Sequence, residues 1–444
     1  MKKIIIAIAA LFLAAAVSQA KDEQITKTGF NLGPLPVVAF DADKGFQLGG
    51  ILNLYNFGDG SNYPNYNSKT YLEASFFTKG SKLFILQHDN KTLIPGVRWS
   101  SSISTALDKA MDFYGFNGYV SNYDWEMVEK GANGESFIYT PFYRFNRVAV
   151  LASTDFTGNI TDNLKWEAGY HGNYFKTGSI DRESINKGKE DSEKFPSEVP
   201  TLYDIYRESG IIGEDEADGG FVSSIRLGLM YDTRDKEGAP SKGVWAEAHL
   251  TAAPKWLGTT VPHYRYSLTW RQYFPIVKND VLTFAYRLNY EGTIGDKAPF
   301  YALPYITVMG ENCDKDGMGG YRTVRGMMRD RTVGLDMATY TAELRWRFTK
   351  FSFANQNIAL GLSVFSDGSK VTKGRDMSAI APGFKNEDND KFHITLGAGF
   401  RFIMNENFIV AFEYGSPLTH FQKSSPLYNQ DGTGAFYINT GFLF

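Results

Sequence analysis

Cysteine is nearly absent from this 444-residue chain, in which Cys313 stands alone. A single thiol excludes an intramolecular disulfide framework and any zinc cluster built on cysteines. We interpret Cys313 as an ordinary loop residue.

Motifs of catalysis are also missing. The chain has neither a Gly-x-Ser-x-Gly elbow nor a His-Glu-x-x-His metal helix. Its six histidines are dispersed, at positions 88, 171, 249, 263, 393 and 420. We therefore expect no catalytic residue, metal or cofactor. A hydrolase embedded in a β-barrel stays a remote alternative, because its residues would converge only in three dimensions.

Long apolar runs are missing after residue 20, so the sequence offers no candidate for a membrane-spanning helix of roughly 20 apolar residues. The first twenty residues differ. Lys2 and Lys3 precede an apolar run, and small residues follow at Ser18 and Ala20. This pattern is typical of a secretory signal peptide over residues 1–20, cleaved after Ala20. Lys21 follows where a lipoprotein would have cysteine.

A strong charge of either sign is lacking. The formal net charge is −3, and removal of Lys2 and Lys3 leaves 44 − 49 = −5. Nothing in this balance indicates a nucleic-acid partner.

Aromatic residues and glycine are abundant. The chain has 26 Tyr, 34 Phe and 44 Gly, which suits the strands and aromatic girdles of a transmembrane barrel. The mean hydropathy of −0.29 does not oppose this interpretation. Spanning strands alternate lipid-facing apolar residues with polar ones that face the lumen, so the average stays low.

From about residue 220 onward, alternate residues divide into an apolar and a polar face, as a strand requires. The apolar faces are Tyr264, Tyr266, Leu268 and Trp270; Leu282, Phe284, Tyr286, Leu288 and Tyr290; Leu344, Trp346 and Phe348; Phe392, Ile394, Leu396, Phe400 and Phe402; and Phe408, Val410, Phe412 and Tyr414. Arginines recur on the opposite face, which predicts a polar lumen. A soluble β-sandwich also alternates, but its apolar faces would meet each other.

The predicted fold is all-β: a transmembrane antiparallel barrel of 16 strands over residues 46–444, after a short periplasmic segment at residues 21–45. In the N-terminal half we expect strands near 46–57, 70–79, 82–106, 137–157 and 164–177. Residues 179–219, rich in charge, predict a surface loop with a short helix near residues 202–208. Residues 294–335 form a second long loop.

Two motifs lie near these loops. A charged turn contains Asp232, Arg234 and Asp235, followed by Pro240 and Gly243. Such residues favour a tight, hydrated turn between two strands. The second motif, GGYRTVRG at residues 319–326, lies in the second long loop. Inward-facing carboxylates follow on later strands, at Glu343 and Asp367.

The order of these motifs resembles that of the BamA/TamA superfamily of outer-membrane assembly and translocation barrels. The resemblance implies that Arg325 and Gly326 form the tip of an inward-folded loop, held by Glu343 and Asp367. A guanidinium can bind two carboxylates through directed hydrogen bonds that a lysine cannot copy. The chain departs from the family pattern at Met327 and Met328, where an aromatic residue is usual, and at Gly368, which follows Asp367 directly.

The ends of the expected barrel carry two further features. The terminal Phe442 and Phe444, on one face with Phe436 and Ile438, resemble the C-terminal sorting signal of outer-membrane barrels. Adjacent glycines weaken a strand. We therefore expect Gly49 and Gly50, on the first strand, and Gly441, on the last, to form a weak lateral seam that opens.

The resemblance implies an outer-membrane protein of a Gram-negative bacterium that inserts or translocates a polypeptide or lipid-linked client. The periplasmic substrate-binding (POTRA) domains of typical members are missing from the sequence, so we expect a barrel-only member that works with periplasmic or outer-membrane protein partners amid outer-membrane lipid. A passive channel for small solutes is the alternative, since the arginine-rich lumen would also serve diffusion.

Overall fold

The computed structural model describes residues 25–41, 45–78, 80–116, 140–191, 194–277, 280–305, 318–379, 392–406, 408–418, 434–440 and 444. The predicted signal peptide, Cys313, Gly441 and Phe442 lie outside these residues. Within them, no helix is both long and apolar enough to span a membrane.

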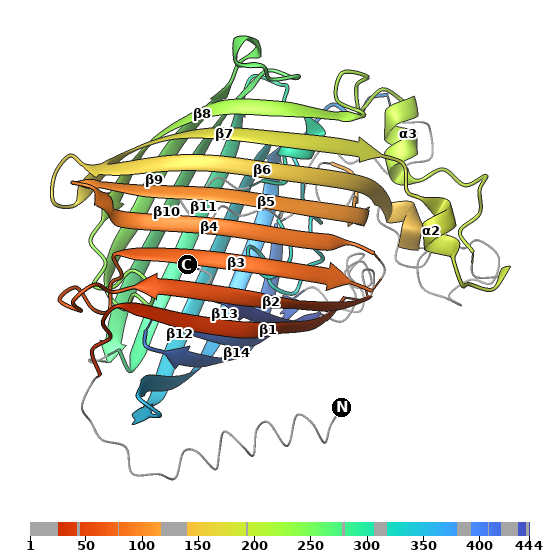
Figure 1. Cartoon of the computed structure of the whole chain (residues 1–444). Helices are drawn as coiled ribbons and strands as arrows, with labels where there is room; N and C mark the ends of the chain where they lie inside the picture. The colour runs from red at the N-terminus through yellow and green to blue at the C-terminus, as the bar shows by residue number, and fades with distance from the viewer. Residues whose placement is uncertain are drawn as a thin grey trace.

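Sixteen antiparallel strands form one sheet in simple chain order, and the sheet curves into a barrel (Figure 1). The strands are β1 (Phe30–Asp41), β2 (Gly45–Asn56), β3 (Ser68–Phe77), β4 (Lys82–Ile94), β5 (Val97–Asp112), β6 (Arg144–Asn159), β7 (Leu164–Gly178), β8 (Gly219–Asp232), β9 (Gly243–Ala253), β10 (His263–Val277), β11 (Leu282–Ile294), β12 (Asp336–Phe353), β13 (Gln356–Lys373), β14 (His393–Met404), β15 (Phe408–Pro417) and β16 (Ala435–Thr440). The predicted all-β barrel of 16 strands is confirmed.

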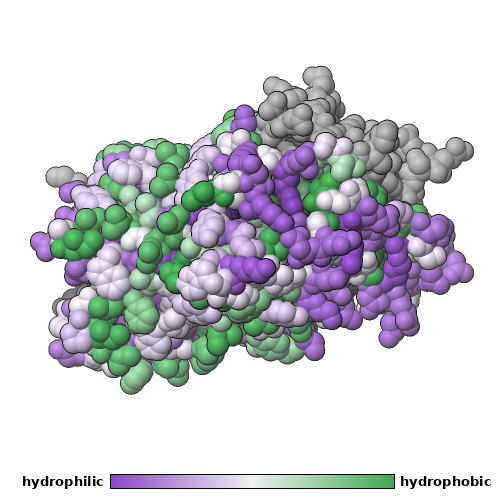
Figure 2. Space-filling model, turned by 90° about the horizontal axis from the view of Figure 1, so that it is seen from above, coloured by the Kyte–Doolittle hydropathy of each residue, from purple (hydrophilic) through white to green (hydrophobic). Residues whose placement is uncertain are grey.

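Alternation along each strand produces the two faces of the barrel. On β10, for example, Leu268 and Trp270 are exposed on the outside, whereas Ser267 and Arg271 are buried inside. The polar faces assigned from the sequence on β10–β15 all point into the lumen. Hydrophobic residues spread over the strand region, and hydrophilic residues gather at the end that carries the helices (Figure 2).

The two ends of the barrel differ. Short turns join the strands at one end, here called the short-turn end, and this end includes the turn at residues 233–242. Longer connections lie at the other, the long-loop end, with helices α2 (Arg182–Asn186) and α3 (Leu202–Glu208) and the 3-10 helices η1 (Thr140–Tyr143), η3 (Lys255–Leu257) and η4 (Phe300–Ala302). Helix α3 lies where the sequence predicted a short helix, and a capping box of Thr201 and Asp204 begins it.

An aromatic cluster lies at the long-loop end. It includes Phe113, Phe116, Phe145, Tyr203, Tyr206 and Phe300, all buried. Glu216 joins the loops: it accepts hydrogen bonds from the backbone N–H of Phe300 at 2.6 Å and from Arg375 at 2.5 Å. The long loops therefore pack on one another.

Strand β1 corrects the predicted boundary at residue 45. Residues 30–41, expected as part of a periplasmic segment, form the first strand, and the segment beginning at Gly45 is the second. Pro34 and Pro36 concealed this strand, because proline cannot donate to a central ladder. An end strand tolerates proline, and β1 pairs with β2 alone among the described strands.

The predicted segment 82–106 is also corrected, because it contains a hairpin rather than one strand. Strands β4 and β5 are joined at Pro95 and Gly96, with Ile94 opposite Val97. Gly96 takes a positive φ of 73°, which permits the tight turn.

Candidate functional site

Arg325 lies in the loop between β11 and β12, and its side chain is completely buried in the lumen. Its Nε and Nη2 donate to the two carboxylate oxygens of Asp367 at 2.8 and 3.0 Å, and its backbone N–H donates to the same side chain at 3.0 Å. Nη1 donates to Glu413 at 2.7 Å, while the carboxylate of Glu343 lies 3.6 Å from Nη2. The guanidinium also stacks on the ring of Phe365 at 3.4 Å.

These charges belong to a larger balanced cluster, the lumen network, of Arg325, Arg345, Arg401, Glu343, Asp367 and Glu413. Arg401 contacts both Glu343 and Glu413, the latter at 2.8 Å. Arg345 lies 3.6 Å from Glu343. Three cations thus face three carboxylates, all nearly inaccessible to water. A buried charge is tolerated when it is paired and hydrogen-bonded, as Arg325 is with Asp367 and Glu413.

Strand parity places these partners. Every second residue of β12, β13, β14 and β15 points inward, so Glu343, Asp367, Arg401 and Glu413 share one lumen wall. Only Arg325 comes from outside the wall. The lumen network therefore attaches the loop to the barrel wall.

The loop tip also touches the wall through its backbone. Gly326 has a φ of 97°, and a Cβ atom added to it would lie 2.6 Å from the carbonyl carbon of Gly415. Its N–H donates to the hydroxyl of Tyr437 on β16 at 2.9 Å. Only a glycine allows the loop to approach β15 this closely, and the same contact reaches the last strand.

The charge state of Arg325 is secure. Burial by itself disfavours the charged guanidinium, but the carboxylates of Asp367, Glu413 and Glu343 outweigh burial and raise the pKa of Arg325 above its ordinary value. When folding raises the pKa of a cation, the stabilising effect is present at any pH below the ordinary pKa. It is lost only as the pH rises through the folded value. Arg325 therefore stays charged throughout the physiological range.

The predicted charged turn joins β8 to β9. Arg234 donates to both oxygens of Asp232, at 2.9 and 2.8 Å. Asp235 accepts from the backbone N–H and hydroxyl of Ser241, at 2.9 and 2.6 Å. Pro240 lies within the turn and Gly243 begins β9. The ion pair and the hydrogen bonds, all between residues of the turn itself, therefore stabilise its conformation.

This turn reaches across the short-turn end of the barrel. Ala239, at its tip, is buried against Ala359, Ile403 and Ile409 of β13–β15. Lys236 pairs with Asp280 at 2.7 Å and with Glu406 at 3.1 Å. On another side of the lumen, Glu237 pairs with Lys91 at 2.6 Å and Arg98 at 3.4 Å. The turn is therefore anchored to several separate parts of the barrel.

We predict that Lys236→Ala combined with Glu237→Gln loosens this turn by about 1 kcal/mol, since ion pairs that are partly exposed contribute little each. Labelling of Ala239→Cys by a maleimide, in a protein whose Cys313 is serine, should become faster. Lys297→Ala is the control, because its 2.7 Å pair with Asp215 is exposed and lies in the long loops. Equal labelling rates in all three proteins would contradict the ion-pair account.

The same turn predicts a pH dependence. Burial opposes ionisation of Asp280, but hydrogen bonds from Lys236 and Ser241 outweigh it and lower the pKa of Asp280 to about 2. For a lowered carboxyl pKa, the stabilisation is complete above the unfolded value of roughly 4 and disappears as the pH falls toward the folded value. Labelling of Ala239→Cys by a disulfide reagent that reacts in acid, such as dithiodipyridine, measured at each pH relative to a free thiol, should rise only below about pH 4.

The C-terminal Phe444 corrects the prediction that its ring shares the outer face of Phe436 and Ile438. Those two side chains are exposed, but Phe444 is buried in the lumen against Tyr273 of β10. Arg345 donates to its carbonyl oxygen at 2.9 Å. Parity predicts faces only while a strand continues, and the described part of β16 ends at Thr440.

The predicted seam residues Gly49 and Gly50 are likewise corrected. They lie on β2, opposite Val37 and Pro36 of β1 and opposite Ser75 and Ala74 of β3. They are therefore inside a paired part of the sheet, and the ends of the strand order are β1 and β16.

The structure brings Arg325, Gly326, Glu343 and Asp367 together, as the resemblance implied. The sequence interpretation missed Glu413, Arg401 and Tyr437 as their partners. Parity had placed Glu413 and Arg401 on the inner face, but nothing local in the sequence indicates which inner residues meet.

Comparisons with known proteins agree with this architecture. Residues 139–444 match the model of the Omp85 superfamily domain. A comparison with curated protein sequences gives no match. BamA from Haemophilus ducreyi lacking POTRA domains 1-3 is similar in structure, with 16% identity, a TM-score of 0.52, and coverage of 94% of this chain and 71% of that one. CdiB from Escherichia coli has 11% identity, a TM-score of 0.55, and coverage of 95% and 66%.

At these identities the two solved structures establish the fold alone, whereas the domain match extends over more than half of the sequence. The match includes both the charged turn and the loop that carries Arg325. The chain belongs to the Omp85 superfamily of β-barrels, as its resemblance to BamA/TamA barrels led us to expect.

Proposed function

We propose that this protein is an outer-membrane barrel that inserts or translocates a polypeptide or lipid-linked client, together with partner proteins. Export would use residues 1–20 as a signal, and the short-turn end would face the periplasm. The observation that carries the proposal is the burial of Arg325 in the lumen network. It supports a loop held in place by specific contacts, as a conditional opening requires.

The contacts of Arg325 and Gly326 with the barrel wall are here called the lock. We propose that this lock restrains β15 and β16, the last strands of the sheet. Through Asp367, Glu413 and Tyr437, the tip of the loop contacts β13, β15 and β16. Release of Arg325 would leave the last two strands with fewer contacts. The proposed functional residues are therefore Arg325, Gly326, Glu343 and Asp367, with Glu413 added.

Strand β1 supports a weak seam opposite β16. Pro34 lies opposite Leu52 and Pro36 opposite Gly50, so both prolines occupy alternate positions of an intact ladder with β2. Their nitrogens must face away from β2, because proline has no N–H to donate. The side of β1 that faces away from β2 therefore lacks two donors, which weakens pairing with any strand placed there.

A disulfide that joins β1 to β16 should abolish client handling, and reduction should restore it. Cysteine pairs would be introduced into a Cys313→Ser protein that replaces the wild type in cells. A pair at Leu229 and Ala248, which are opposite each other on β8 and β9, controls for oxidation. Full function with the seam closed would contradict the proposal.

The alternative, a passive channel for small solutes, is favoured only by the arginines that line the lumen. Crosslinked co-purification from outer membranes and proteomics after depletion separate the two. Loss of particular outer-membrane proteins or lipids, with a crosslinked client, supports assembly or translocation. Altered uptake of small solutes with an unchanged membrane proteome supports a channel.

A further inference from the structure

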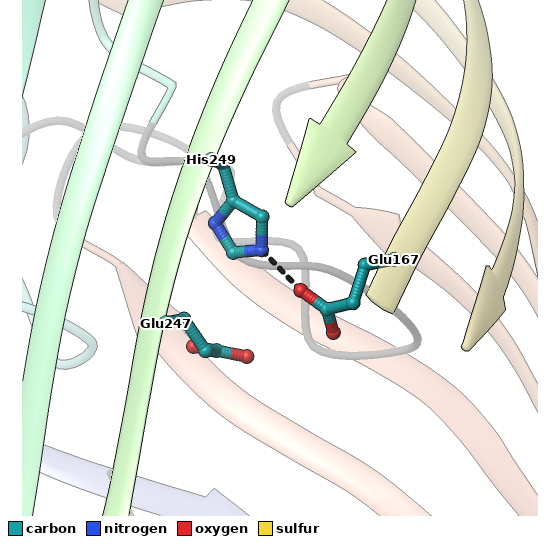
Figure 3. Close-up of side chains that lie close together, drawn as sticks. All are labelled: Glu167, Glu247 and His249. Atoms are coloured by element: carbon teal, nitrogen blue, oxygen red, sulfur yellow. Dashed lines mark hydrogen bonds and ion pairs between the residues drawn. The ribbon is translucent and has the colours of Figure 1, made fainter. Parts of the chain in front are cut away.

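Another cluster of buried side chains lies on the lumen wall away from the lumen network. Glu167 projects from β7, and Glu247 and His249 project from β9 (Figure 3). One ligand-type atom from each lies within 4.8 Å of the other two. His249 Nε2 lies 2.6 Å from a carboxylate oxygen of Glu167. We propose that these three side chains bind a divalent transition-metal ion such as Zn²⁺.

The strand between the ligands is shaped for this approach. Gly228 of β8 is opposite both Glu167 and His249, so the three residues form one row across three strands. A Cβ atom at Gly228 would lie 2.4 Å from Cδ2 of His249 and 3.1 Å from a carboxylate oxygen of Glu167. The absence of a side chain there lets the two ligands meet above β8. Any larger residue would separate them.

The cluster also has unused binding capacity. One carboxylate oxygen each of Glu167 and Glu247 is buried without a hydrogen-bond partner in the described structure. Arg271 pairs with the other oxygen of Glu247 at 2.6 Å, and no described cation forms an ion pair with Glu167 apart from His249. Two buried carboxylates thus face one arginine and one histidine. A bound divalent cation would compensate the remaining negative charge.

The donor set decides between metals. One imidazole nitrogen and two carboxylate oxygens suit Zn²⁺ in an open site, in which water completes the coordination. Ca²⁺ and Mg²⁺ prefer oxygen ligands alone and are disfavoured by the imidazole. Metal–ligand distances of about 2.0–2.2 Å require His249 and Glu167 to separate slightly while Glu247 moves closer. Such an ion would link β7 to β9 across β8.

The test measures Zn²⁺ and Co²⁺ binding to tag-free, full-length protein in detergent after treatment with a chelator. We expect about one Zn²⁺ per chain, a Co²⁺ absorption spectrum typical of nitrogen and oxygen ligands without sulfur, and a rise in unfolding temperature with Zn²⁺. Affinity should increase with pH, since the ligands must be deprotonated. Ca²⁺ and Mg²⁺ should neither bind with comparable affinity nor displace Co²⁺.

His249→Gln and the nearly isosteric Glu247→Gln should weaken Zn²⁺ binding by at least ~10-fold, the lower limit for the loss of an outer-shell contact. His171→Gln is the matched control. His171 is buried on β7 and pairs with Asp155 at 2.8 Å, yet the pair belongs to no three-ligand group among the described residues. Heat-modified electrophoretic mobility verifies that each variant folds.

Three results would overturn the metal site. They are a wild-type protein that binds no Zn²⁺ beyond the level of His249→Gln, equal losses in the His171→Gln control, and no Co²⁺ spectrum at one equivalent. The last measurement needs only the wild-type protein, so it decides even where a variant does not fold.

Discussion

Arg325→Ala is expected to release the lumen loop and lower its local stability by about 3–5 kcal/mol, the cost of removing one partner from a buried ion pair. Asp367 and Glu413, both buried, would each lose a direct hydrogen bond from the guanidinium. Limited proteolysis in residues 318–335 and urea titration with heat-modified mobility as readout would measure the release.

Two variants separate this lock from general damage to the lumen. Arg325→Lys keeps the charge but cannot bind Asp367 through two parallel hydrogen bonds, so an intermediate loss is expected. Arg271→Ala breaks a buried 2.6 Å pair with Glu247 between two adjacent wall strands. It should lower barrel stability without exposing the loop to protease. Equal proteolysis in Arg271→Ala and Arg325→Ala would contradict a specific lock.

Gly326→Ala is expected to displace the loop as strongly as Arg325→Ala, although it removes no charge. The new methyl group would overlap backbone atoms of Gly415 and Ser416, each 2.6 Å away, and backbone cannot move aside as a flexible side chain can. A left-handed conformation adds about 1–2 kcal/mol for any residue with a Cβ atom. The hydrogen bond to Tyr437 would be lost with the contact.

Gly258→Ala isolates the steric part of that prediction. Gly258 has a φ of 96°, almost that of Gly326, but nothing lies within 4 Å of its added Cβ. It should show the conformational cost alone and leave the loop protected. If both alanine variants behave alike in proteolysis of the loop, the close approach to β15 does not hold the tip.

The parts of the fold that could be predicted from sequence are those set by local alternation. Trp270, Arg271 and Glu343 fall on their observed faces because neighbouring residues in a strand point to opposite sides. Strand β1 could not be recognised in this way, since Pro34 and Pro36 oppose a strand everywhere except at an end of the sheet. Its position as the end strand is a property of the whole barrel.

The candidate site was partly predictable for a similar reason. Arg325, Glu343 and Asp367 were identified through motif order, whereas Glu413 required knowledge of which inner residues converge. The proposed metal ligands are harder still to predict from the sequence, because Glu167 and His249 are 82 positions apart and meet only above Gly228. The face of Phe444 was predicted wrongly because the alternation of β16 was extended beyond its described end.

Single-channel conductance in planar bilayers tests most directly whether Arg325 holds the loop inside the lumen. Wild type, Arg325→Ala and the double variant Glu343→Gln with Asp367→Asn would be compared with Arg271→Ala. We predict a small or absent conductance in wild type and Arg271→Ala, and a larger, fluctuating conductance in the other two. Identical conductance in all four proteins, with unchanged heat-modified mobility, would contradict this prediction.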